Sequence, residues 1–335
     1  MINSLKTCAV IGAGLSGLTV AKNLHKFLDV TIYEKSLGPG GRMATRRNEP
    51  YSFDHGAQYF TAKTKYFREF VDKLFIKGCV ERWDARFVEI DKGKISNNWQ
   101  WGEHYPHYVG VPSMNAIAKS LTEMLKINLG IRIKSIEKAS TNWELFDEEG
   151  KTLGVYDWVI IATPVANTCE ILPNEISFQD TIQSIKMTPC FSLMLGFDKH
   201  ISLDFDAALV RGQDISWISV NSSKPTRAKP FSLLIHSTNL WAEEHLNDDK
   251  SQVVEHLCSQ LKLVTGIDAR NTSHQALHTW KYANAKKRYG EPCFIDTNQQ
   301  LAVCGDWLIQ GNVEAAFISG LETANKIIKY IINVE

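Results

Sequence analysis

Three glycines near the amino terminus have the spacing of a dinucleotide-binding turn. Gly12, Gly14 and Gly17 match the pattern G-x-G-x-x-G, and Glu34 follows about 20 residues after the first of them. In such a turn the first glycine allows a tight bend, the second lets a pyrophosphate approach the backbone, and the third lets helix and strand pack closely. The helix that begins near Ser16 then directs its positive end at the phosphates. We therefore predict that this turn binds a dinucleotide.

The acidic residue Glu34 indicates which dinucleotides the turn can bind. The Glu34 carboxylate can accept hydrogen bonds from a ribose 2′-hydroxyl and would repel a 2′-phosphate, so NADP is disfavoured at this site. A glycine-rich turn without a ligand is the alternative, but it would not require all parts of the fingerprint together. The turn by itself does not distinguish NAD from FAD.

The elements around the turn occur in the order that such a site requires. Residues 6–11 are typical of a buried parallel strand, residues 16–27 have apolar side chains at helical spacing, and residues 30–34 form a second strand. These three segments predict one βαβ unit. Further helices are predicted at 64–77, at 114–125 with Ser113 as its cap, at 250–265 and at 313–330, and further strands at 131–138, 143–146, 155–162, 193–197, 215–221, 232–236 and 301–304.

The middle of the chain predicts a second domain. Residues 80–109 are aromatic, alternating and rich in turns, which indicates antiparallel strands, whereas both termini carry parts of one α/β domain. The predicted fold class is α/β: a Rossmann-like nucleotide-binding domain with an inserted α+β domain on a mixed or antiparallel sheet with helices. The predicted boundaries are 1–62, 110–170 and 285–335 for the nucleotide-binding domain, and 63–109 and 171–284 for the inserted substrate domain.

Composition excludes several classes of partner and site. Lys and Arg together number 37, as do Asp and Glu, so no nucleic-acid or membrane partner is predicted. The seven cysteines form no C-x-x-C pair, which indicates reduced thiols and no metal site. Because no run approaches the roughly 20 apolar residues of a membrane span, we expect a soluble, cytoplasmic protein.

Two further segments point to a flavin. Gly40-Gly41-Arg42 supplies a flexible loop and a guanidinium for a pyrophosphate, and residues 301–320 place Gly305-Asp306 between a strand and the last helix. These segments resemble the flavin-containing amine oxidase superfamily, which shares its architecture with p-hydroxybenzoate hydroxylase. Within it, the chain is most similar to the renalases, on the segments G-G-R-M-A-T (40–45), D-H-G-A-Q-Y-F-T (54–61), V-G-V-P-S-M (109–114) and C-G-D-W (304–307).

The resemblance implies a bound FAD and a set of residues that contact it. The last helix would direct its amino terminus at the flavin, where it stabilises the negative charge of the reduced ring. No S-G-G-C segment, which anchors covalent FAD in monoamine oxidases, is evident, so non-covalent FAD is expected. The implied cofactor-binding residues are Gly12, Gly14, Ser16, Gly17, Glu34, Lys35, Gly41, Arg42, Ala57, Gln58, Ile133, Thr163, Gly305, Asp306, Asn312 and Val313. For Ile133 and Thr163, ordinary packing is an equal alternative.

The resemblance to renalases also implies a reaction. Renalases oxidise isomers of reduced NAD(P) that carry the hydride at the 2 or 6 position, and they pass the electrons to O2, which gives H2O2. Hydride loss from a dihydropyridine leaves an aromatic ring, so no base is needed. The predicted catalytic residues are Gln58 and Tyr59, in the segment that faces the flavin, and Trp307, which could instead pack under the last helix.

Four other functions remain open. Many amine oxidases carry a lysine near flavin N5, and residues 188–197 contain none, which disfavours an amine oxidase. A desaturase of the same fold would need a long apolar tunnel. A non-catalytic protein similar to the GDP-dissociation inhibitors is disfavoured by Glu34, Arg42 and Asp306, and an NAD-linked dehydrogenase by the carboxyl-terminal flavin segment.

Overall fold

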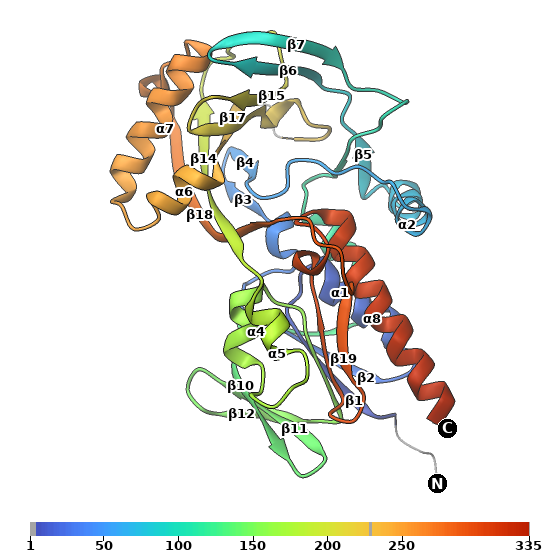
Figure 1. The fold of residues 1–335 in the computed structure, drawn as a ribbon. Coiled ribbons are helices and arrows are strands. Elements are labelled where there is room, and N and C mark those ends of the chain that lie inside the picture. Colours follow the sequence, from blue (N-terminus) through green and yellow to red (C-terminus); the bar gives the residue numbers. More distant parts are fainter. Residues whose placement is uncertain (1–4, 228–229, 335) are drawn as a thin grey trace. The chain divides into compact units, whose positions relative to one another are not determined.

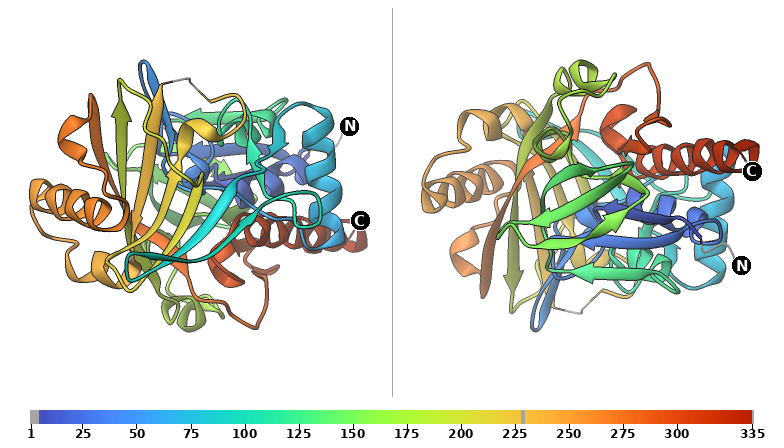
Figure 2. Two further views of the ribbon diagram at one scale, coloured as in Figure 1. Left: turned by 90° about the horizontal axis from the view of Figure 1, so that it is seen from above. Right: turned by 90° about the horizontal axis from the view of Figure 1, so that it is seen from below.

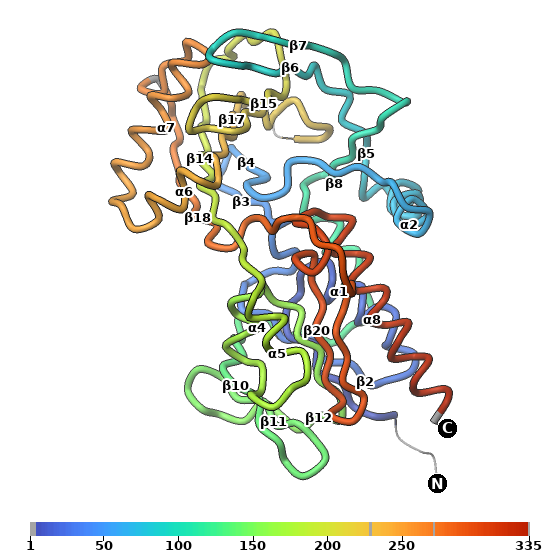
Figure 3. The backbone as a smooth tube through the Cα atoms, in the orientation of Figure 1, coloured from blue at the N-terminus to red at the C-terminus, as the bar shows by residue number. Residues whose placement is uncertain are grey.

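The computed structural model describes residues 5–227 and 230–334, and these residues form two compact units. The first unit contains the residues up to Arg42, Ala118–Met187 and the residues from Ala285 onward. The second unit contains Met43–Ile117 and Thr188–Asn284. The backbone path in Figure 3 shows how each unit is assembled from segments that are distant in the sequence.

A six-stranded sheet is the centre of the first unit. The strand order is β19-β20-β13-β1-β2-β9, and every neighbouring pair is parallel except β19 and β20. Its inner strands are short apolar runs because both faces of the sheet are covered. The strands are β1 (Thr7–Ile11), β2 (Asp29–Glu34), β9 (Lys126–Leu129), β13 (Trp158–Ile161), β19 (Cys293–Asp296) and β20 (Leu301–Cys304).

Different elements cover the two faces of this sheet. Helices α1 (Leu15–Leu24) and α8 (Val313–Val334) lie side by side, as Figures 1 and 2 show. On the other face, alternate residues of the sheet pack into a core with Trp143, Leu145 and Ile136 of a three-stranded antiparallel sheet. That sheet comprises β10 (Ile133–Ala139), β11 (Asn142–Asp147) and β12 (Thr152–Tyr156), and the short helices α4 (Val165–Ile171) and α5 (Gln179–Gln183) add to the same core.

The second unit is built on a seven-stranded sheet in the order β18-β14-β17-β16-β15-β6-β7. Helix α7 packs on one face with Val253, Leu257 and Leu261. On the other face, Tyr51 and Phe53 pack on the sheet. The strands are β6 (Arg86–Asp91), β7 (Lys94–Gln100), β14 (Met187–Phe197), β15 (Ala207–Arg211), β16 (Ile215–Val220), β17 (Phe231–Ser237) and β18 (His274–Ala285), with helices α6 (Asn239–Glu244) and α7 (Lys250–Thr265).

The remaining elements of the second unit are short. A hairpin of β3 (Thr45–Asn48) and β4 (Tyr51–Asp54) provides Tyr51 and Phe53, and β5 (Val80–Arg82) pairs with β8 (Tyr108–Gly110). Helix α2 spans Lys65–Ile76. Helix α3 spans Ala116–Leu121, so its last residues belong to the first unit.

The structure confirms the predicted α/β class with a Rossmann-like parallel sheet, and α7 spans the predicted residues. The predicted helix over 114–125 is wrong in extent. Helix α3 ends at Leu121, Met124 has a positive φ of 67°, and the chain then forms β9 beside β2. The predicted strand over 155–162 is two strands, because Asp157 accepts hydrogen bonds from the backbone N–H and hydroxyl of Thr7 between them.

The compact units divide the chain at other points than the predicted domains. Residues 43–62 and 110–117 group with the second unit, and residues 171–187 group with the first. Residues 1–4 and 335 of the predicted nucleotide-binding domain and residues 228–229 of the predicted substrate domain lie outside the described residues. The assignment of a nucleotide-binding and a substrate role to the two units remains a prediction. Within the described residues, no helix is both long enough and apolar enough to cross a membrane.

Candidate flavin site

The glycine turn joins β1 to α1 at the carboxyl edge of the parallel sheet. Gly12 has a φ of +107°, and a Cβ at this position would lie 2.8 Å from the carbonyl oxygen of Ala162. A Cβ on Gly14 would meet no atom within 4 Å, so the space in front of the α1 amino terminus is open. Gly14 caps α1 without any side-chain hydrogen bond to the helix. Because glycine has no side chain, Gly14 leaves the first-turn N–H groups of α1 without a side-chain cap at this position, as binding of a phosphate requires.

Glu34 stands at the end of β2 and holds this turn. Its side chain is buried, with one carboxylate oxygen accepting from the Ala13 N–H and the other from the Ser36 N–H, both at 2.8 Å. Each carboxylate oxygen can accept a further hydrogen bond, which leaves capacity for ribose hydroxyls. The Ile131 N–H also donates to the Glu34 carbonyl, which brings the start of β10 to the same place. Ile133 itself is buried in the core of the first unit.

Arg42 and Asp306 come together beside the glycine turn. The Arg42 Nη1 donates to Asp306 Oδ2 at 2.8 Å, and its Nη2 donates to Oδ1. The loop before Arg42 is fixed on the turn because the Gly40 N–H donates to the Ala13 carbonyl at 2.9 Å. A Cβ on Gly41 would lie 3.4 Å from the Cα of Gly14. The structure therefore brings the predicted G-G-R loop, the glycine turn and Asp306 to one edge of the sheet.

Trp307 is a correction to the predicted catalytic residues. Its side chain is fully buried in the core of the first unit, and its Nε1–H donates to the carbonyl of Thr163 at 2.9 Å. A Cβ on Gly305 would lie 2.3 Å from that Nε1, so the indole packs directly on the glycine. Trp307 has no exposed surface with which to cover a flavin, and the alternative of packing holds. Thr163 is part of the same packing.

The side chain of Asn312 caps the amino terminus of α8. The Asn312 Oδ1 accepts from the Ala315 N–H at 2.8 Å, which fixes the amino terminus of the helix. Val313 is buried, whereas Asn312 and Lys35 are exposed. Ser16, in the first turn of α1, is buried.

The turn that follows β4 in the second unit carries the other predicted residues, Ala57, Gln58 and Tyr59. The Gln58 Nε2 donates to the carbonyls of Asp54 and Gly56, at 2.5 and 2.9 Å. Its Oε1 accepts from the Ser219 hydroxyl at 2.8 Å and from the Lys224 Nζ at 3.1 Å. All four hydrogen-bonding positions of the amide are occupied, so this side chain shapes the turn and has no polar atom to spare.

The backbone carbonyl of His55, in the same turn, is fixed by hydrogen bonds from other residues. Its carbonyl accepts from the Ser192 hydroxyl at 2.7 Å and from the Trp280 Nε1 at 2.8 Å, and it lies 3.3 Å from the His236 Nε2. The imidazole stacks on the Trp280 ring, and its Nδ1 is buried without a partner. Burial lowers the pKa of His55 to about 4, so the ring is neutral near pH 7. These contacts suit a structural residue better than a base.

Tyr59 belongs to an aromatic cluster. Its ring centroid lies 4.9 Å from those of Trp101 and His107 and 5.5 Å from that of Trp217. Burial raises the pKa of the Tyr59 phenol, so it stays protonated at neutral pH. The Trp217 Nε1 is buried with no hydrogen-bond partner. The cluster offers flat apolar surface and a protonated hydroxyl.

A buried charge cluster was not predicted from the sequence. Asp54 accepts hydrogen bonds from Arg227 Nε at 2.9 Å and Nη2 at 2.6 Å, and the Lys224 Nζ lies 3.6 Å from the same carboxylate. All three side chains are almost completely buried. Because Asp54 is separated from both basic residues by more than 160 positions, no local spacing could have revealed the cluster.

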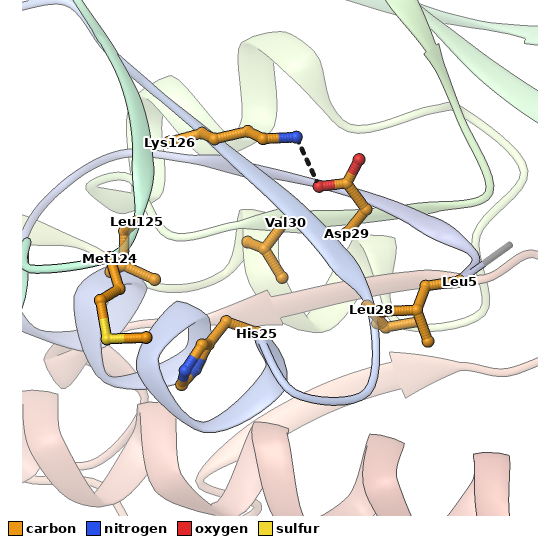
Figure 4. A pocket seen from close by; sticks show the side chains of 8 residues that line it. All are labelled: Leu5, His25, Leu28, Asp29, Val30, Met124, Leu125 and Lys126. Carbon is orange, nitrogen blue, oxygen red and sulfur yellow. Dashed lines mark hydrogen bonds and ion pairs between the residues drawn. The ribbon is translucent and has the colours of Figure 1, made fainter.

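One hollow of the first unit lies away from this site. The hollow in Figure 4, with a volume of about 370 Å³, is lined by His25, Val30 and Lys126 among others, at the amino ends of β2 and β9. It therefore lies at the opposite edge of the sheet from the glycine turn. Within residues 5–227 and 230–334, no group of His, Cys, Asp or Glu side chains could hold a metal ion.

Comparison with protein families identifies the chain. Residues 10–74 match the NAD(P)-binding Rossmann-like domain, and residues 91–328, more than half of the chain, match the flavin containing amine oxidoreductases. The chain belongs to this family of flavin containing amine oxidoreductases. Membership implies oxidoreductase chemistry with a flavin cofactor. The first unit fits that cofactor, because it combines the open space at Gly14, the spare acceptor capacity of Glu34 and the Arg42 guanidinium.

Curated relatives match over short stretches. A 4,4′-diapophytoene desaturase of Staphylococcus haemolyticus is 33% identical over 101 residues, which covers 27% of this chain and 20% of that protein. A probable flavin-containing monoamine oxidase A of Dictyostelium discoideum is 31% identical over 94 residues, covering 28% of this chain and 19% of that protein. The matches span about a fifth of the length of these relatives.

Solved structures share the whole fold. A putative protoporphyrinogen oxidase from Exiguobacterium has a TM-score of 0.78 at 11% identity, with 97% of this chain and 99% of that chain covered. A triple mutant of putrescine oxidase has a TM-score of 0.72 at 11% identity, with the same coverage. At this identity the likeness establishes the architecture alone.

Proposed function

We propose that this protein is an FAD-dependent, renalase-like oxidase that removes a hydride from dihydropyridine isomers of reduced NAD(P) and passes the electrons to O2, which forms H2O2. The observation that carries the proposal is the saturation of the turn after β4. Gln58 has no free polar atom, His55 is neutral and held by its backbone, and β14 contains no lysine. A substrate that loses only a hydride needs no base and suits such a turn.

The first unit supplies the residues that would hold FAD without a covalent bond. The α1 amino terminus, with Gly12 and Gly14, would face the pyrophosphate, and Glu34 would bind the ribose hydroxyls. Arg42 carries positive charge for the pyrophosphate while Asp306 orients the guanidinium. Gly17, Gly41 and Gly305 permit the close packing of these segments.

Bound flavin would supply the hydride acceptor, its N5 atom. The residues of this chain would then orient the substrate and exclude water. Ala57 and Gln58 are proposed to keep their predicted place beside the flavin, with Gln58 acting through the shape of the turn. Tyr59, whose ring has aromatic neighbours and whose phenol stays protonated, offers a stacking surface and a hydrogen-bond donor for a pyridine ring.

A second candidate, amine oxidation or desaturation, has support from the names of the curated relatives. An amine must lose its proton before hydride transfer, so its oxidation rate would fall steeply below the amine pKa. Dihydropyridine oxidation has no such requirement. The two functions therefore differ in their dependence on pH as well as in their substrates.

Anaerobic mixing of the purified holoprotein with each reductant tests the proposal. The flavin absorbance should bleach faster with the 2- or 6-dihydro isomers of NAD(P) than with normal NADH, benzylamine or a polyamine, and readmitted O2 should restore the colour with formation of H2O2. Denaturation should release FAD into the supernatant. Equal or faster bleaching by an amine would replace the proposal with amine oxidation, and a colourless protein that binds no added FAD would exclude both.

A further inference from the structure

Lys224 is a buried lysine whose ammonium contacts the proposed active-site turn. It follows the short 3-10 helix η2 (Asn221–Ser223), and its side chain is completely buried. The Nζ lies 3.1 Å from the Oε1 of Gln58, 3.6 Å from the Oδ2 of Asp54 and 5.3 Å from the centre of the Trp83 ring. Lysines are rarely buried to this degree without a reason in the structure or the function.

The charges around Lys224 do not balance. Arg227 already neutralises Asp54 through two hydrogen bonds, and its Nη1 donates to the carbonyls of Pro112 and Pro225. The Lys224 ammonium is therefore an additional positive charge. The other titratable group that faces it is His236 on β17, whose pKa is lowered mainly by burial and further by the Lys224 charge. The remaining neighbours, Trp83 and the Ser219–Gln58 pair, are neutral.

This environment makes Lys224 titrate near neutrality. Burial disfavours the ammonium and lowers the pKa of Lys224 to about 8, assisted by Arg227 and opposed by Asp54. The two partners keep their charges over this range. The pKa of Asp54 stays below its usual value because of Lys224 and Arg227, and an arginine does not lose its proton in proteins.

The protonation of Lys224 bears directly on Gln58. With the ammonium present, the Gln58 Oε1 accepts one charged and one neutral hydrogen bond, from Lys224 and Ser219. Loss of the proton converts the stronger of the two into a neutral bond. The Gln58 Nε2 binds the carbonyls of Asp54 and Gly56, so the orientation of this amide determines the path of the turn.

We propose that Lys224 is a positioning residue, whose ammonium holds the Gln58 amide and thereby keeps the turn over residues 54–59 in the conformation that supports flavin reduction. This inference rests on the proposed function, because that function places the turn beside the flavin. It adds a proton-dependent step that the proposed function does not require. Lys224 does not touch the substrate and acts only through Gln58.

A pH titration of the holoprotein tests this role. The visible spectrum of the bound flavin and the anaerobic rate of flavin reduction should both change in one step near pH 8. We expect the rate to fall about fivefold across the step, as a charged hydrogen bond becomes a neutral one. The variant Lys224→Met, similar in length but without charge, should fold, because the Asp54–Arg227 pair remains balanced. Its spectrum and rate should not change with pH, and its rate should be no higher than that of the wild type above the step, because methionine donates no hydrogen bond to Gln58.

Ser219→Ala is the matched second variant. It removes the other donor to the Gln58 Oε1, so the amide depends on Lys224 alone and the step at pH 8 should become larger. A step that persists in Lys224→Met, a wild type without a step, or a step of unchanged size in Ser219→Ala would each overturn the inference. The spectral titration needs no substrate. It therefore remains decisive even if an amine replaces the dihydropyridines as reductant, in which case only the proposed function fails.

Discussion

Arg42 and Asp306 lie 264 positions apart in the chain, yet their side chains form an ion pair with two parallel hydrogen bonds. The pair joins the loop after β2 to the segment after β20. Asp306 is buried and the Arg42 side chain is largely so. This contact assembles the proposed pyrophosphate-binding edge of the first unit from both ends of the sequence.

Replacing Arg42 with Lys should weaken FAD binding about tenfold, because an ammonium keeps the charge but loses the planar two-armed geometry. Titration of the apoprotein with FAD, followed by quenching of flavin fluorescence, measures this loss. Arg211→Lys is the control, since Arg211 pairs with Glu89 on the surface of the second unit and should leave FAD affinity unchanged. Equal affinity in Arg42→Lys and wild type would show that the guanidinium is not at the pyrophosphate.

Replacing Glu34 with Ala should cost about 1–3 kcal/mol of FAD binding free energy, because the charged hydrogen bonds to the ribose and the support of the turn are both lost. The Ala13 and Ser36 N–H groups lose their acceptor, so the free energy of unfolding should fall as well. Glu34→Gln, which keeps one acceptor oxygen, should fall between Ala and the wild type. Calorimetric titration with FAD checks the order, and Glu170→Gln, on an exposed ion pair, is the control. An unchanged affinity in Glu34→Ala would remove Glu34 from the ribose.

Replacing Trp307 with Phe should lower the free energy of unfolding by about 2 kcal/mol, because a buried hydrogen bond to Thr163 and packing volume are lost. Urea denaturation of the apoprotein measures this effect. FAD affinity should change far less than in Arg42→Lys. The opposite pattern, with stability retained and FAD affinity lost, would restore the contact with the flavin that the sequence predicted for Trp307.

Lowering the pH should destabilise the folded protein at pH values above those at which most carboxylates become protonated. Burial lowers the pKa of both His55 and His236 to about 4, from 6.5 for an unperturbed histidine. In this window the unfolded chain binds more protons than the folded chain, so the free energy of unfolding should fall as the pH drops from about 6.5 to about 4. Urea denaturation across this range measures the slope. His236→Asn should reduce the slope to the part that His55 contributes, and a slope that is the same in the variant would assign the acid sensitivity to other groups.

The sequence by itself predicted the features that depend on residues close together along the chain. The βαβ unit, the glycine turn with Glu34 and the helix at Lys250–Thr265 follow from short-range spacing, because a glycine that must avoid Ala162 or an apolar stripe on a helix leaves a local pattern. The same reasoning failed at 114–125. There a helical pattern ended early because Lys126–Leu129 completes the edge of the parallel sheet next to β2.

Tertiary structure alone determined the contacts that give individual side chains their roles. Trp307 could equally have covered a flavin or filled a core, and only the packing around Thr163 and Gly305 distinguishes the two. Likewise, the sequence predicted Gln58 as a catalytic residue, and only the tertiary structure shows that Ser219 and Lys224 donate to its oxygen. The physical reason is that burial and hydrogen-bond saturation depend on which distant segments pack together. Such contacts leave no periodicity or spacing in a single sequence.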